Sequence, residues 1–179
     1  MDIQPYKQSL TFSCLAASFL MILEKEKEIE FNEITEQEIA LLGSRRIYPF
    51  YVVGITTEMV KKYGHKVKVI ADNKYFANIL DKSFSDQKDI SVEAKPITAM
   101  FIRELVEEQP VVCHIDDHGL GDYSHASHFI VIEKGGKGSF TVVDPWTGKR
   151  KRITDKTLEN AIYELKTHVK MCPLLFHLC

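Results

Sequence analysis

Apolar residues along this chain follow helical spacing in the first half and strand-like spacing in the second. The run CLAASFLMILEKEKE predicts a helix over 14–28, with Ser13 as its N-cap and a charged, exposed end. Helical spacing recurs over 35–42, 55–63, 73–81, 98–108 and 155–165. Gly43 and Gly64 are predicted to end the first two of these segments.

Strand-like patterns are concentrated after residue 110. Predicted strands cover the segments HKVKVIAD (65–72), VVCHI (111–115), HFIVIE (128–133), SFTVVD (139–144) and PLLFHL (173–178). Helices first and strands later favour the α+β class, with N-terminal helices packed on an antiparallel sheet. A length of 179 residues without a linker or repeat predicts a single domain over 1–179.

The hairpin HFIVIEKGGKGSFTVVD places two chemically relevant side chains near each other. If the loop 134–138 joins a paired 133 and 139, paired residue numbers sum to 272, and His128 lies directly opposite Asp144. Directly opposed side chains share a face, with Cβ atoms about 4.5–5.5 Å apart. A carboxylate at that distance can hold one imidazole tautomer and stabilise the imidazolium. A slip by one residue would put the pair on opposite faces.

Cys14 stands at the start of the first predicted helix. A helix N-terminus favours the thiolate form, which is the nucleophilic form of cysteine. The small residues at 16–18 allow another element to approach closely. Acyl transfer also needs donors for the developing oxyanion, and the Cys14 backbone N–H and the Gln8 side-chain amide are the candidates.

Three motifs carry a resemblance to a known family. They are QSLTFSCLAASFLMIL, HFIVI and VVDPWTG, and ITEQEIALLG and EEQPVVCHI are also similar. In this order they resemble the papain-like peptidases that process the double-glycine leader peptides of bacteriocins, together with their stand-alone relatives. The resemblance implies a papain-like cysteine peptidase fold and cleavage of a peptide or protein substrate after glycine. It also implies Gln8 as oxyanion donor, Cys14 as nucleophile, His128 as general base and Asp144 as its orienting partner.

The chain departs from the family pattern in places. Leu15 stands where glycine usually follows the cysteine, and Ser13 where an acidic residue often precedes it. The region 29–100 is longer than the compact family domain needs. Two alternatives therefore stay open: a non-enzymatic peptide-binding module on the same fold, and a transglutaminase-like or deamidase-like acyl transferase that uses a similar Cys–His–Asp set.

Composition narrows the location and the class of partner. The net charge of −2 gives no general attraction to nucleic acid, and the basic run 149–152 is predicted to be a solvated strand. No apolar run is long enough to span a membrane, and the segment FLMILEKEKE has no small residues for signal-peptide cleavage. Four scattered cysteines do not form a disulfide framework, which favours a cytoplasmic location.

The histidine-rich segment CHIDDHGLGDYSHASH raises a metal hypothesis. Its candidate ligands are Cys113, His114, His118, His125 and His128. Because Cys113 and His114 are adjacent on a predicted strand, they point to opposite faces. We therefore expect neither a metal nor another cofactor. Of the two last histidines, His128 is predicted to be the base, since the register leaves His125 without a carboxylate.

Overall fold

The computed structural model describes residues 2–25, 31–45, 50–121 and 124–179. Its centre is a seven-stranded mixed sheet of order β2-β1-β7-β3-β4-β5-β6. The strands are β1 Val67–Ala71, β2 Ile90–Ala94, β3 Val111–Asp116, β4 Ser127–Glu133, β5 Ser139–Asp144, β6 Lys149–Thr154 and β7 Leu174–Leu178. β1 and β2 are parallel, and the other neighbouring pairs are antiparallel.

Six α-helices lie within the described residues. They are α1 Cys14–Lys25, α2 Glu33–Ser44, α3 Phe50–Tyr63, α4 Lys74–Ser83, α5 Ala99–Glu108 and α6 Asp155–Glu164. A 3₁₀ turn, η1 (Asp117–Leu120), follows β3, and a π-helical turn, η2 (Leu165–Val169), follows α6. The α+β class is thus confirmed, while the sheet is mixed rather than wholly antiparallel.

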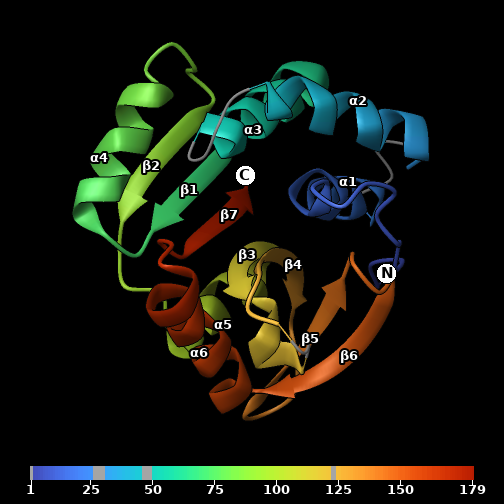
Figure 1. Cartoon of the computed structure of the whole chain (residues 1–179), viewed down its shortest axis with the longest axis vertical. Coiled ribbons are helices and arrows are strands. Elements are labelled where there is room, and N and C mark those ends of the chain that lie inside the picture. The colour runs from blue at the N-terminus through green and yellow to red at the C-terminus, as the bar shows by residue number, and fades with distance from the viewer. Residues whose placement is uncertain (1, 26–30, 46–49, 122–123) are drawn as a thin grey trace.

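Helices cover both faces of the sheet. Figure 1 shows α1–α3 on one side of the strands and α5 and α6 on the other. Successive residues of a strand point to opposite faces of the sheet and so pack in different cores. On β4, Phe129 packs in the core that includes residues of α1–α4, and Ile130 packs in the core of α5 and α6. β4 is therefore buried on both faces, which fixes the position of every side chain along it.

The boundary between α2 and α3 corrects one prediction. Gly43 does not end α2, which continues to Ser44. A Cβ on Gly54 of α3 would lie 2.8 Å from the Gly43 carbonyl oxygen, so these two glycines are the point where the helices cross. Gly64 does end α3, in the left-handed conformation with φ +74°. Residues 26–28 of the first predicted helix lie outside the described residues.

Two edge strands complete the sheet. β2 was not predicted; it joins β1 in parallel after the crossover through α4. β6 contains the basic run 149–152 and pairs with β5, as predicted. Its side chains bond within the chain: Arg150 Nη2 lies 2.9 Å from Glu133 Oε2, and Arg152 Nε donates to Ser139 Oγ at 2.7 Å.

Over the described ranges, no helix combines the length and the apolar character that crossing a membrane requires.

Candidate active site

Cys14 is the first residue of α1. The Ala17 N–H donates to the Ser13 carbonyl oxygen at 2.8 Å, so helical hydrogen bonding starts at the predicted N-cap. The Ser13 hydroxyl does not cap the helix; it bonds to the Leu10 carbonyl and to the Glu36 carboxylate. The Cys14 side chain is nearly buried, at 6% exposure, and sits where the positive end of the helix dipole favours a negative charge.

His128 and Asp144 form a buried pair. His128 Nε2 lies 2.9 Å from Asp144 Oδ1. Asp144 also accepts the Trp146 N–H at 2.9 Å and the Thr147 hydroxyl at 2.8 Å, so its carboxylate is fixed by the turn after β5. The Cys14 side chain lies near this pair, and it is one of the groups that raise the pKa of His128. Nε2 is taken by Asp144, which leaves Nδ1 as the ring nitrogen for the thiol.

The predicted hairpin register is wrong by two residues. Val131 pairs with Val143, and Glu133 pairs with Thr141, so paired numbers sum to 274 rather than 272. A shift of two keeps every side chain on its predicted face. His128 and Asp144 therefore still meet, as diagonal rather than direct neighbours, and the long imidazole spans the extra distance.

The charges in this site favour an imidazolium. Burial opposes the charge on His128, but the hydrogen bond to Asp144, the nearby Cys14 side chain and the charges of Cys14 and Asp117 together raise the pKa of His128 to about 10. Burial likewise opposes ionisation of Asp144, but the hydrogen bond to His128 and its positive charge lower the pKa of Asp144 to about 2. At neutral pH the imidazole is charged and its carboxylate is ionised.

Gln8 lies beside the turn that follows Asp144. Its backbone N–H donates to the Pro145 carbonyl at 2.7 Å, and its side-chain Nε2 donates to the Leu10 carbonyl at 2.6 Å. The amide group is buried, and its Oε1 has no hydrogen-bond partner among the described residues. One N–H of Nε2 is used by Leu10, so one remains for an oxyanion.

Two buried carboxylates join the site that the sequence did not single out. Glu36 of α2 accepts the Ser9 N–H at 2.9 Å and bonds to the Ser13 hydroxyl, and so holds the loop that leads into α1. Asp117 of η1 places a carboxylate oxygen within 4.8 Å of the ligand atoms of His128 and Asp144. The doublet "DD" in the histidine-rich segment was the only signal for Asp117.

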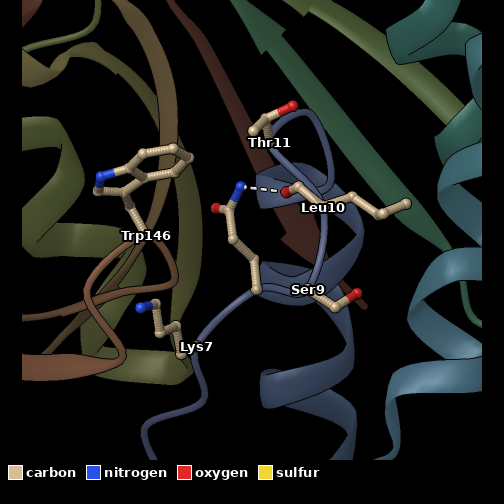
Figure 2. Close-up of a pocket in the computed structure, with 6 residues that line it drawn as sticks. Lys7, Ser9, Leu10, Thr11 and Trp146 are labelled. Atoms are coloured by element: carbon tan, nitrogen blue, oxygen red, sulfur yellow. Dashed lines mark hydrogen bonds between the residues drawn. The ribbon is translucent and has the colours of Figure 1, made fainter.

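Two pockets flank Trp146. One, of about 280 Å³, is lined by Gln8, Trp146 and the neighbours of Gln8 in the chain. Figure 2 shows Trp146 facing Leu10 and Thr11 across it. The other, of about 260 Å³, is lined by Asp117, Asp144, Trp146 and residues of η1 and β6. The two pockets thus share Trp146, and the second one also includes Asp144 of the buried pair.

The histidine-rich segment separates into different sites. Cys113 packs in the α5 and α6 core, whereas His114 stacks on Phe129 with ring centroids 4.3 Å apart, so the two do point to opposite faces. His125 does not lack a carboxylate, contrary to the prediction, because its Nδ1 lies 2.7 Å from Asp116 Oδ2. The two histidines therefore have different carboxylate partners: Asp116 for His125 and Asp144 for His128.

No family model and no curated protein matches the sequence. The assignment of a function therefore depends on the geometry of the site and on the motifs.

Proposed function

We propose that this chain is a papain-like cysteine peptidase that cleaves peptide or amide bonds through an acyl-enzyme on Cys14. The observation that carries the proposal is that His128 bonds to Asp144, that the Cys14 side chain is near enough to help raise the pKa of His128, and that Cys14 begins a buried helix. A thiol, an imidazole and a carboxylate linked in that order are the groups that cysteine-based acyl transfer requires. The resemblance of the motifs to double-glycine leader peptidases supports the same assignment.

The proposed reaction has two steps. The Cys14 thiolate attacks the scissile carbonyl carbon, the C–N bond breaks, and the His128 imidazolium gives its proton to the leaving amine. Water then attacks the thioester and passes a proton to His128, and the acid product leaves as the thiolate re-forms. Asp144 keeps Nε2 occupied and stabilises the imidazolium. The Cys14 backbone N–H and the Gln8 amide stabilise the oxyanion in both steps.

The surroundings of Cys14 favour a small residue beside the scissile bond. Cys14 is only 6% exposed as a residue, so a branched side chain on the acyl residue would block the approach of the carbonyl. Glycine has no side chain and meets this limit, in agreement with the preference that the resemblance implies. The two pockets that share Trp146 are the places for the flanking parts of a peptide.

Competitive alkylation tests the role of Cys14 against a simple exposure effect. Cys179 is the exposed cysteine, and burial raises the pKa of Cys113 and, to about 11, that of Cys172. With limiting iodoacetamide at neutral pH, we expect Cys14 to be labelled ahead of Cys179, in spite of its burial. His128→Ala should remove this advantage, and His125→Ala, the matched control, should keep it. Labelling of Cys179 first in wild type would contradict the proposal.

An acyl-glycyl electrophile tests the reaction itself. Wild type should form a thioester adduct that maps to Cys14, and Cys14→Ala should form none. Turnover of the adduct by water identifies a hydrolase, and faster turnover with an added amine identifies an acyl transferase. A well-folded wild type that binds peptide without acylation would instead support the binding module.

A cytoplasmic location belongs to the same proposal, supported by the four unpaired cysteines.

A further inference from the structure

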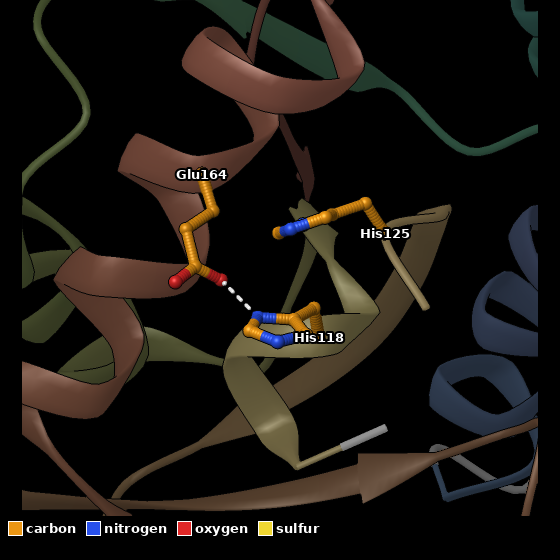
Figure 3. A group of neighbouring side chains, drawn as sticks. All are labelled: His118, His125 and Glu164. Atoms are coloured by element: carbon orange, nitrogen blue, oxygen red, sulfur yellow. Dashed lines mark hydrogen bonds and ion pairs between the residues drawn. The ribbon is translucent and has the colours of Figure 1, made fainter. Parts of the chain in front are cut away.

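A cluster of metal-type ligands lies on the outer side of η1. His118 of η1, His125 from the segment before β4 and Glu164 at the end of α6 point toward one another, as Figure 3 shows. His118 Nδ1 lies 3.0 Å from Glu164 Oε2, and one ligand atom from each residue lies within 4.8 Å of the other two. Three segments far apart in sequence thus bring two imidazoles and one carboxylate together.

The packing of η1 on α6 explains why the cluster forms. Gly119 lies against Ala161 so closely that a Cβ at Gly119 would be 2.5 Å from the Ala161 Cα. Glu164 is three residues after Ala161, on the same face of α6. The neighbour of Gly119, His118, is therefore held beside the Glu164 carboxylate by backbone contact rather than by the ion pair alone.

The partner of His125 resembles the outer shell of a metal site. Asp116 is fully buried and accepts from His125 Nδ1 at 2.7 Å. It also accepts the backbone N–H groups of Ala126, at 3.0 Å, and His118, at 3.2 Å. With the proton held at Nδ1, the Nε2 lone pair of His125 is available as a ligand, and metal-binding histidines are oriented by carboxylates in this way.

We propose that His118, His125 and Glu164 bind a divalent transition-metal ion of the Zn²⁺ type. Two imidazoles and a carboxylate at about 2.0–2.2 Å are ligands that zinc accepts, with a fourth position left for water or another group. The exposed imidazole of His168, on η2, is stacked on His125 with ring centroids 4.2 Å apart, so a further imidazole lies beside the cluster. The ion would join η1 to α6, one residue from Asp117. This site is separate from Cys14 and does not depend on the proposed peptidase activity.

Cobalt and zinc titrations of the purified chain test the site. Bound Co²⁺ should give the visible absorption band that is typical of nitrogen and oxygen ligands, without a thiolate charge-transfer band. Added Zn²⁺ should displace the Co²⁺ and remove that band. His125→Ala and Glu164→Gln should each weaken binding by at least about tenfold, and Asp116→Asn by about 10–100-fold through the outer shell. Zn²⁺ should also raise the Tm of wild type and leave that of His125→Ala unchanged.

Two controls exclude the other candidate positions. Within the part of the chain that the structure describes, the buried group of Asp117, His128 and Asp144 is the other set of possible ligands, so His128→Ala should retain the affinity of wild type. His65→Ala, at a distant histidine, should retain it as well. Loss of binding in His128→Ala, a thiolate band, equal affinity in His125→Ala, or no binding by wild type would each overturn the proposal.

Discussion

His114 is predicted to be the main histidine through which acid destabilises this protein. It is fully buried and stacked on Phe129. Its Nδ1 lies 3.2 Å from the Cys172 carbonyl, and its Nε2 lies 2.7 Å from the Ser127 hydroxyl. A neutral ring with the proton on Nδ1 satisfies both bonds, as donor to the carbonyl and acceptor from the hydroxyl. A second proton would place a charge in the core.

The size and direction of the effect follow from the shifted pKa. Burial, opposed in part by the Cys172 hydrogen bond and assisted by the charge of His128, lowers the pKa of His114 from 6.5 to about 3. Because the folded-state pKa is below the unfolded one, the unfolded chain binds more protons in this window. The stability from neutral His114 is complete above the unfolded pKa and is lost as the pH falls toward about 3. One proton corresponds to about 1.4 kcal/mol per pH unit, or about 2–3 kcal/mol between about pH 6 and about pH 4.

Urea unfolding at several pH values measures this contribution. His114→Gln is the informative variant, because its amide can donate and accept but does not titrate. The free energy of unfolding of wild type should fall about 2–3 kcal/mol further than that of the variant over the same window. His65→Gln should follow wild type. Parallel curves for wild type and His114→Gln would refute the reasoning. His128 does not interfere, since its raised pKa contributes stability below pH 6.5 that is lost toward about pH 10.

Three other substitutions test the scaffold and the proposed site. Gly54→Ala should destabilise the protein by about 1–3 kcal/mol in urea unfolding, because the new methyl group meets the Gly43 backbone; an unchanged midpoint would contradict the close crossing. Glu36→Ala should lower the free energy of unfolding by about 2–4 kcal/mol in the same assay, because the Ser13 hydroxyl and the Ser9 N–H both lose their charged partner. Gln8→Ala should lower kcat by about 10²–10³ with the fold and the labelling of the nucleophile retained, and near-normal turnover would remove Gln8 from the mechanism.

Local patterns in the sequence were sufficient for most elements and for the pairing of His128 with Asp144. Apolar spacing identified α1 and β4, and the left-handed Gly64 ended α3 as predicted. The pairing of His128 with Asp144 could be predicted because a hairpin is a local structure, and alternation alone assigns both side chains to one face. These features depend on residues close together in the chain.

The tertiary structure decided what depends on distant contacts. The loop after β4 packs closely on the start of β5, since a Cβ at Gly135 would lie 2.2 Å from the Ser139 carbonyl oxygen. Glu133 pairs with Thr141 rather than with Ser139, so the loop is longer than predicted and the register is shifted by two. The Glu36 carboxylate reaches Ser13 across 23 positions, and Glu164 reaches His118 across 46. No periodicity or spacing encodes such contacts, because they exist only after the helices have packed on the sheet.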